Sequence, residues 1–466
     1  MMKNDVLVIR NASFPLEKKF LKKDLVVKKG RIDGFYPPFS AEIKGARLID
    51  ASGLVCLPGL VDAHTHFKLK IGKNSYNSDD FSSGTRAALA GGITTVVDFT
   101  DQGQGVPFVV GLRKRLNDAR ISYCDYSFHC IVPPFSSMKN FSLEFSSALK
   151  AGISTFKIFT AYKSRGLKLE KEDIIRLLKE AAKKGAMVTV HAEKEELIEK
   201  NFLKLSKHIK QMGMKALPAV RNEESEISAV REIISLNEKI KAPLYFVHIS
   251  SPVSAGIIEK ASSRMPVRAE TCPQYLVLNK DIYSRRNAYL YSFCPPSRSS
   301  KSSMAMWIAL KRGALSVLAT DSCGFSISVK RQWNGDINKL YMGISSSQFL
   351  LPLVYTFGVK KGLISMERLC ELCCSNPALL MGIENKGFLK KGYYADLVLF
   401  DPQASFKISK KDLLNSCGYS VYEGMKVYGK VKKVFLRGRQ VYSEGVFSPP
   451  SGRYIKRKSP ILSSIL

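Results

Sequence analysis

The sequence predicts an α/β fold in which a (β/α)8 TIM-like barrel is joined to a small composite β-sandwich domain built from both chain ends. In the central part of the chain, eight short apolar runs rich in β-branched residues alternate with amphipathic segments of helical period. Both flanks instead contain short strand-like runs separated by turn residues. Alternating strands and helices are typical of a parallel barrel, and the flanking strands favour a separate unit beside it.

The expected barrel strands are short and apolar, and they lie at residues 60–66, 94–99, 126–132, 155–160, 187–191, 244–249, 267–271 and 316–321. The expected helices between them lie at residues 79–90, 107–118, 143–151, 171–184, 224–239, 253–263 and 302–312. Glycine follows several of these helices, at positions 91–92, 152, 185 and 313. Glycine commonly ends a helix because it adopts the left-handed conformation without steric cost.

The two flanks predict a second, smaller domain. Short strands are expected at 5–9, 25–27, 395–399 and 431–436, and neither flank alone is large enough to bury a core. We therefore assign residues 1–57 and 386–447 to the two parts of one β-sandwich, and residues 58–385 to the barrel. The remaining residues, 448–466, are rich in Ser, Pro and basic side chains, and we expect a tail that docks on a neighbouring subunit or stays mobile.

Composition bounds the class of protein. With 466 residues, 45% of them hydrophobic, the chain can bury a large core. It contains neither a run of about 18 apolar residues nor an apolar secretory signal, so we expect a soluble, cytoplasmic protein with no membrane partner. The ten cysteines have no framework spacing, and the cluster of Cys370, Cys373 and Cys374 is expected on the buried face of a helix over 365–381.

The formal net charge of +32 raises the question of a nucleic-acid or acidic-membrane partner. The basic residues are spread from Lys18 to Lys458, and the densest groups lie near the two ends. No nucleic-acid-binding motif is present. A solvated, Lys-rich surface is therefore favoured over a specific polyanion site, and no nucleic-acid partner is expected.

Six possible metal ligands end strand-like runs at widely separated positions: His64, His66, Lys157, His191, His248 and Asp321. In a (β/α)8 barrel, functional groups stand at the carboxyl ends of the strands, so one rim could gather all six. Alternate residues of a strand share a face, which lets both His64 and His66 point into the barrel mouth. Only His129 and His208 of the six histidines lack this context, and we interpret them as structural or surface residues.

The chain resembles the dihydropyrimidinase and hydantoinase branch of the cyclic amidohydrolases, a metal-dependent hydrolase superfamily. The resembling segments cover nearly the whole chain in the family's order: 59–67 (GLVDAHTHF), 78–99, 154–163 (STFKIFTAYK), 190–193 (VHAE), 247–251 (VHISS), 270–276 (ETCPQYL), 319–321 (ATD), 375–378 (SNPA), 394–402 (YADLVLFDP) and 420–425 (SVYEGM).

The resemblance implies a cofactor of two Zn²⁺ per subunit, bridged by a carboxylated Lys157. One zinc would take His64, His66, the carbamate and Asp321, and the other would take the carbamate, His191 and His248. A free lysine is a cation and a poor ligand, whereas a carbamate offers two anionic oxygens, which explains a lysine in this set.

The resemblance also implies the reaction: hydrolysis of a dihydropyrimidine or hydantoin ring at its amide bond to an N-carbamoyl amino acid, as in pyrimidine catabolism. Asp321 would act as general base and then acid, and Tyr162 would hydrogen-bond the developing oxyanion. Cys294 and Met342 match positions that contact the small-molecule substrate largely through backbone atoms. A homotetramer or homodimer is implied as well.

Several residues depart from the family's pattern and leave alternatives open. Lys68 and Lys70 follow the His-x-His step, Ser322 stands where a His usually follows the last ligand, and the 341–345 loop and Cys294 are altered. Lys68 has the spacing of a dihydroorotase Arg that binds a substrate carboxylate, although a charged rim residue is the simpler interpretation. The alternatives are an allantoinase-like or dihydroorotase-like amidohydrolase, and an inactive family scaffold; the six intact ligand positions argue against the scaffold.

Overall fold

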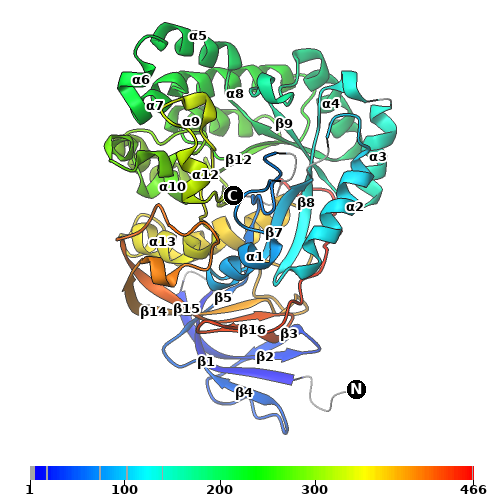
Figure 1. Cartoon of the computed structure of the whole chain (residues 1–466). Coiled ribbons are helices and arrows are strands. Elements are labelled where there is room, and N and C mark those ends of the chain that lie inside the picture. The colour runs from blue at the N-terminus through cyan, green and yellow to red at the C-terminus, as the bar shows by residue number, and fades with distance from the viewer. Residues whose placement is uncertain are drawn as a thin grey trace.

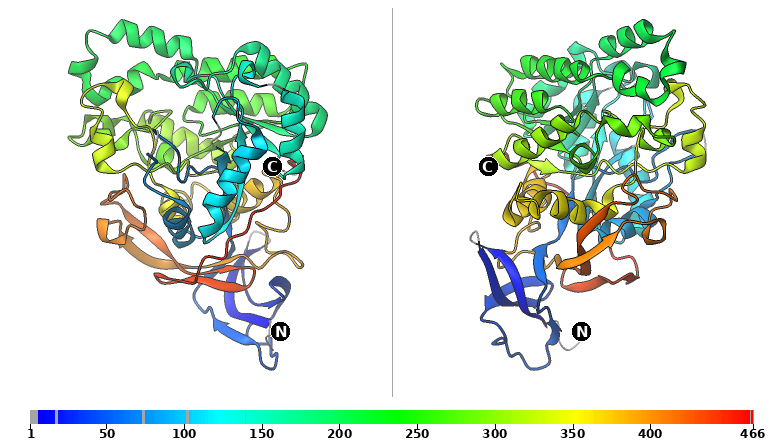
Figure 2. Two further views of the ribbon diagram at one scale, coloured as in Figure 1. Left: turned by 45° about the vertical axis from the view of Figure 1, so that its right-hand side comes forward. Right: turned by 90° about the vertical axis from the view of Figure 1, so that its left-hand side faces the viewer.

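The computed structural model describes residues 6–16, 19–72, 75–100, 103–138, 140–463 and 465. Within these residues, an eight-stranded parallel sheet and a nine-stranded mixed sheet form two bodies joined end to end (Figure 1). Asp5, expected in the first strand, and Lys18, in a basic cluster, lie outside the described residues. In the views of Figure 2 the nine-stranded sheet lies below the helices that surround the barrel.

The eight-stranded sheet is the predicted barrel. Its neighbouring strands pair in parallel and in sequence order, from β6 to β13. Their bounds are β6 Leu60–Asp62, β7 Ile93–Thr100, β8 Asp125–Ile131, β9 Thr155–Phe159, β10 Met187–His191, β11 Leu244–Phe246, β12 Val267–Thr271 and β13 Val317–Leu318. Almost every strand residue is buried, as expected where a parallel sheet is covered on both faces.

All seven predicted helices are present as α1 Phe81–Ala90, α2 Phe108–Asp118, α3 Phe141–Lys150, α4 Lys171–Lys184, α8 Glu223–Asn237, α9 Pro252–Ser262 and α11 Ser300–Arg312. Additional short helices are α5 Glu195–Leu205, α6 Ile209–Met212, α7 Ala216–Val220, α10 Pro273–Val277, α12 Ile327–Arg331 and α13 Leu350–Val354. Gly185 ends α4 at a φ of 63°, the left-handed conformation expected of a C-terminal glycine.

The cysteine-containing helix is also confirmed. Helix α14 Met366–Cys370 continues through a π-helical turn, Glu371–Ser375, into α15 Asn376–Leu380. Cys373 and Cys374 are fully buried there, and Cys370 is partly buried. In the described part of the chain, no helix is both long and apolar enough to cross a bilayer.

Side chains complete the barrel where its first and last strands meet. Asp62, the last residue of β6, accepts hydrogen bonds from the backbone N (3.0 Å) and Oγ1 (2.5 Å) of Thr320. Just beyond, the His66 amide donates to the Ser322 carbonyl at 2.9 Å, and Thr65 forms an isolated parallel bridge with Ser322. These contacts hold the segments after β6 and β13 side by side.

The two chain ends form one composite domain, as predicted. Its strands are β1 Val6–Leu16, β2 Lys19–Lys28, β3 Arg31–Tyr36, β4 Arg47–Asp50, β5 Val55–Pro58, β14 Leu397–Lys407, β15 Lys426–Leu436, β16 Arg439–Ser443 and β17 Val446–Phe447. The N-terminal and C-terminal parts join where β5 pairs antiparallel with β14. Apolar residues of both parts, including Phe14, Ile32, Leu397 and Phe435, share one buried core. Neither flank therefore buries its apolar residues alone.

The expectation for the C-terminal tail is wrong, because the tail docks on its own barrel. Four of its backbone amides donate to carbonyls near the amino-terminal side of the barrel: Gly452 to Ser122, Ile455 to Tyr126, Arg457 to Gly152 and Lys458 to Gly382. The buried Arg457 guanidinium donates to Phe128 O, to Ser127 Oγ (3.0 Å) and to Thr155 Oγ1 (2.7 Å). A composition rich in Ser, Pro and basic residues did not reveal this one buried arginine.

Replacing Arg457 with alanine should destabilise the protein by about 1–3 kcal/mol, because buried oxygens of β8 and β9 lose their donor. The measurement is urea unfolding of Arg457→Ala against Lys458→Ala, which removes an exposed tail side chain and keeps its backbone bond to Gly382. Equal stability of the two variants would show that the tail does not anchor through Arg457.

Candidate metal centre

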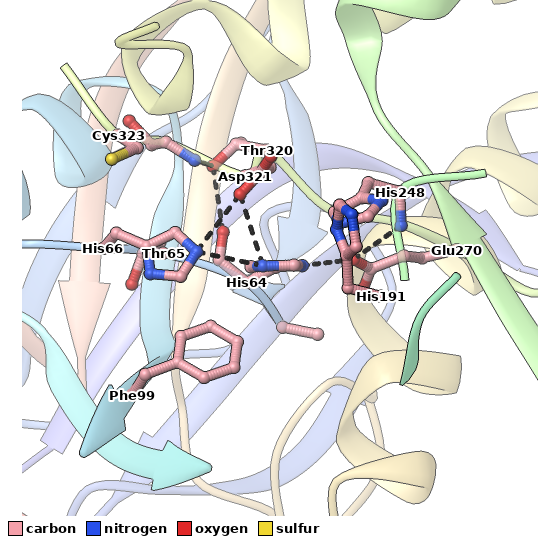
Figure 3. Close-up of polar contacts among 12 residues, drawn as sticks. His64, Thr65, His66, Phe99, His191, His248, Glu270, Thr320, Asp321 and Cys323 are labelled. Atoms are coloured by element: carbon pink, nitrogen blue, oxygen red, sulfur yellow. Dashed lines mark hydrogen bonds and ion pairs between the residues drawn. The ribbon is translucent and has the colours of Figure 1, made fainter. Parts of the chain in front are cut away.

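All six predicted ligands lie at the carboxyl rim of the barrel, and Figure 3 shows His64, His66, His191, His248 and Asp321 together with Glu270. Lys157 lies within β9 and His191 ends β10. The other four lie just beyond their strands, which corrects the expected strand bounds: His64 and His66 follow β6, His248 follows β11 and Asp321 follows β13. The strands stop early because the chain turns there to direct these side chains into the barrel mouth.

The backbone at two ligands is strained. His248 has a φ of 42° and Asp321 a φ of 49°, in the left-handed region that residues with a Cβ avoid. Tyr162, also predicted to act in the site, has a φ of 70°. Such conformations cost about 1–3 kcal/mol each and concentrate at functional sites, because the surrounding structure holds them in place.

His64, His66 and Asp321 form the first ligand group. The Nε2 atoms of His64 and His66 are 3.2 Å apart, and Asp321 Oδ1 is 3.2 Å from the first and 3.3 Å from the second. His64 Nδ1 lies 2.5 Å from Glu270 Oε1, and burial raises the pKa of Glu270 to about 8, so the contact holds one proton between the two groups. A metal at His64 Nε2 would require this proton on Nδ1, the tautomer in which the Nε2 lone pair faces the other two ligand atoms.

His191 and His248 form the second group beside the first. His191 Nδ1 is 2.9 Å from His248 Nε2, and the His64 and His248 ring centroids are 5.5 Å apart. His191 Nε2 donates to Glu193 Oε2 at 2.9 Å, which leaves the Nδ1 lone pair directed at His248. Each group therefore contains a histidine whose outer ring nitrogen contacts a buried glutamate, the arrangement common around metal-bound histidines.

Lys157 lies at the same rim and is 1% exposed. Its Nζ is 5.4 Å from the ring centre of Phe99 and 5.2 Å from that of Phe159. Burial lowers the pKa of Lys157 to about 7, against the opposing attraction of Glu270 and Asp321. A substantial fraction of this lysine is therefore a neutral amine near neutral pH, which is the nucleophilic form.

The remaining electrostatics suit a cation. Burial, above all, lowers the pKa values of His64 and His248 well below their usual range, so both rings are neutral at physiological pH. Burial opposes the charge of Asp321, but His64 and His66 outweigh it and keep the pKa of this carboxyl below its ordinary value. The two groups thus combine the neutral imidazoles of His64 and His248 with the anionic carboxylate of Asp321.

These residues fit a divalent metal. Tetrahedral zinc with bonds of about 2.0–2.1 Å places its ligand atoms about 3.3 Å from one another, close to the three distances in the first group. The three ligand atoms all lie within 4.8 Å of one another. Imidazole and carboxylate are also the donors that zinc prefers in catalytic sites.

The substrate side of the rim opens into a cavity of about 1400 Å³ that is lined by all six predicted ligands and by the predicted substrate residues Tyr162, Cys294 and Met342. Burial raises the pKa of Tyr162 well above its usual value, so its phenol keeps its proton, and its hydroxyl hydrogen-bonds the Cys294 thiol. Arg221 lies over the Tyr162 ring at 4.9 Å. The three residues predicted to meet substrate therefore share one cavity with the metal ligands.

The residues that depart from the family's pattern have clear positions. Lys68 Nζ donates to Asp118 Oδ1 at 2.6 Å and does not line the cavity, which supports its interpretation as a rim charge. Ser322 contributes its backbone to barrel closure, and its Oγ accepts from the Ser346 amide. Lys70 lines the cavity.

The two histidines left out of the site are also placed as expected. His129 is buried between the Ala63 carbonyl, 2.8 Å from Nε2, and Thr155 Oγ1, 2.7 Å from Nδ1. His208 is exposed.

Sequence reasoning missed the carboxylates that hold the ligands. Glu270 is fully buried at the end of β12, where it contacts His64 and accepts from the Tyr245 hydroxyl at 2.8 Å. Glu193, two residues after His191, also binds Arg221. The sequence did offer one signal for Glu270: a carboxylate near the end of a buried strand indicates a partner, because a charge is rarely buried alone.

The fold and the paired ligand groups define a class of metal-dependent hydrolase, and comparisons with known proteins identify the family. The Amidohydrolase family model matches residues 55–441. D-phenylhydantoinase of Escherichia coli O1:K1 is 32% identical over 459 residues, 96% of each chain. The solved dihydropyrimidinase from Brevibacillus agri NCHU1002 has a TM-score of 0.93 at 30% identity, covering 98% of this chain and 99% of its own.

A solved D-hydantoinase gives the same TM-score of 0.93 at 31% identity, with 97% of this chain and 99% of that chain covered. The chain therefore belongs to the amidohydrolase family, within the branch that contains the hydantoinases and dihydropyrimidinases. It is a hydrolase of cyclic amides, and the prediction from the sequence is confirmed at this level.

Replacing Glu270 with glutamine should lower the affinity for divalent metal by about 10–100-fold, because His64 loses the carboxyl partner that orients its ring. Competition with a chromogenic chelator measures this affinity. Glu226→Gln is the matched control: Glu226 is equally buried, but its partners are Ser250, Ser251 and Arg298. An equal loss of affinity in both variants would mean that Glu270 does not support the ligand.

Proposed function

We propose that this protein opens the ring of a dihydropyrimidine or hydantoin at its amide bond and releases an N-carbamoyl amino acid. The observation that supports this most directly is that both ligand groups line the same cavity as Tyr162, Cys294 and Met342. The volume of about 1400 Å³ exceeds the ~300–1,000 Å³ typical of ligand sites, which leaves room for a substituent on the ring.

We propose two zinc ions as the cofactor, with Lys157 carboxylated. The neutral Lys157 amine would attack CO2 to form a carbamate and release one proton, which converts a poor ligand into a bridging anion. His64, His66 and Asp321 would hold one ion and His191 and His248 the other, with the carbamate common to both. When bound, such ions lower the pKa of a coordinated water and polarise a carbonyl.

Asp321 is the proposed proton carrier. His64 and His66 keep the pKa of Asp321 low, so its carboxylate is free to accept the proton of the attacking water. The same group then delivers this proton to the ring nitrogen as the amide C–N bond breaks. The protons balance: one moves from water to Asp321 and then to the leaving nitrogen.

Tyr162 is the proposed oxyanion donor. Its raised pKa keeps a donor proton on the phenol at neutral pH, and Arg221 and His191 pack against its ring. Because these contacts fix the Tyr162 ring before substrate arrives, the phenol is preorganised to stabilise the negative charge that develops on the substrate's carbonyl oxygen. Cys294 and Met342 would hold the substrate ring through their backbones.

Lys68 bears on the alternatives. Its ion pair with Asp118 turns the ammonium away from the cavity, so it is not placed to bind the carboxylate of dihydroorotate. A dihydropyrimidine or hydantoin lacking this carboxylate is therefore the better substrate class. Pyrimidine catabolism, a cytoplasmic location and a homotetramer or homodimer stay predictions from the sequence resemblance.

Assays on dihydrouracil, hydantoin, allantoin and dihydroorotate should show ring opening of dihydrouracil or hydantoin, detected as the N-carbamoyl product. Removal of metal by a chelator should abolish this activity, and added Zn²⁺ should restore it. Turnover of dihydroorotate alone would contradict the proposed substrate class.

Tyr162→Phe should lower kcat on the best substrate by about 100-fold, the effect of losing one oxyanion donor. Tyr393→Phe, in the β-domain, is its control.

A further inference from the structure

A buried lysine that the proposed reaction does not use lies behind the substrate side of the cavity. Lys330, in α12, is 0% exposed. Its Nζ donates to the carbonyl oxygen of Ser292 at 2.7 Å and to Ser292 Oγ at 2.8 Å. Burying an ammonium is costly, and neither of these partners is a carboxylate. Stability alone does not account for a buried lysine without a carboxylate partner, which points to a functional role.

Ser292 joins the two segments that carry the proposed substrate contacts. Its Oγ donates to the Tyr341 carbonyl at 2.9 Å, and its own carbonyl accepts from the Gly343 amide at 2.9 Å. Met342 lies between these two bonds, and Cys294 lies two residues along the chain from Ser292. Lys330 therefore binds a residue that bonds to both sides of Met342 and lies two residues from Cys294.

The loop of residues 341–345, which contains Met342, is held from its other side as well. The Cys323 amide donates to the Ile344 carbonyl at 2.8 Å, two residues after Asp321. A Cβ on Gly343 would lie 2.3 Å from the Cys323 carbonyl oxygen, so only glycine allows this close approach. The loop thus lies between the Ser292 segment and the segment of Asp321, and a shift at Ser292 would move its free edge in the cavity.

We propose that Lys330 is a positioning residue that sets the substrate-binding backbone at Cys294 and Met342 through Ser292. This inference rests on the proposed function for its effect on substrate, but its effect on the loop is independent of that function. Burial lowers the pKa of Lys330 to about 7. Both the amine and the ammonium have N–H donors, so the bond to the Ser292 carbonyl survives either state.

Lys330→Met tests the inference, because methionine fills the same space without a donor. The backbone segments would hold the ring equally before and during reaction, so their displacement should raise KM about tenfold with little change in kcat. Zinc content should be unchanged. Lys301→Met, which removes an exposed lysine from α11, is the control for lost charge. A structural role alone would instead lower thermal stability and the active fraction at constant KM.

Ser292→Ala removes only a hydroxyl and carries the same test if Lys330→Met does not fold. It should raise KM by less than Lys330→Met, because the carbonyl bonds remain. The two effects should be less than additive in the double variant, since both variants remove the bond between Lys330 Nζ and Ser292 Oγ. Additive effects, or an unchanged KM in both single variants, would overturn the inference.

Hydrogen exchange separates this inference from the proposed function. In Lys330→Met the amide of Gly343 should exchange faster, while amides of β10 should not change. Faster exchange in a protein that opens no cyclic amide would refute the proposed function and leave the positioning role intact. Unchanged exchange together with an unchanged KM in an active enzyme would refute the positioning role alone.

Discussion

The structure depends on a set of electron-pair donors buried at the carboxyl rim of the barrel. The Nε2 atoms of His64 and His66 and the Oδ1 atom of Asp321 lie 3.2–3.3 Å from one another, and in the neighbouring group His191 Nδ1 lies 2.9 Å from His248 Nε2. Burial keeps His64 and His248 neutral and leaves Lys157 with a pKa of about 7. Lone pairs crowded together out of water are stabilised by shared cationic charge, which is the physical basis for a metal centre.

The supporting structure gives this rim its geometry. Glu270 and Glu193 contact the outer ring nitrogens of His64 and His191, and the bonds between Asp62 and Thr320 keep the first and last strands together. The left-handed backbone at His248 requires that the surrounding contacts outweigh its strain. On the substrate side, ion pairs and buried donors such as Lys330 hold loops that no regular strand supports. The rigid barrel thus places the ligands, and local polar contacts place the loops.

Much of the fold and of the ligand set could be predicted from the sequence, because strand and helix periods are local and barrel strands end at one rim. The gathering of the six candidate ligands at that rim could be predicted for the same reason. Strand ends were less predictable: the turns that direct His248 and Asp321 inward depend on contacts far away in the sequence. Glu270 and the docking of Arg457 depend equally on such contacts. Neither the role of Glu270 nor that of Arg457 leaves a periodic pattern in the sequence, so both are visible only in the folded structure.

The bridging role of Lys157 is the central claim, and the metal content of the purified protein tests it most directly. Protein prepared without chelators and in the presence of CO2 should contain two zinc ions per chain, as measured by inductively coupled plasma mass spectrometry. Lys157→Met should retain at most one, because the ligand common to both ions is lost. Two ions per chain in the variant, or one or fewer in the wild-type protein, would contradict a lysine-bridged pair.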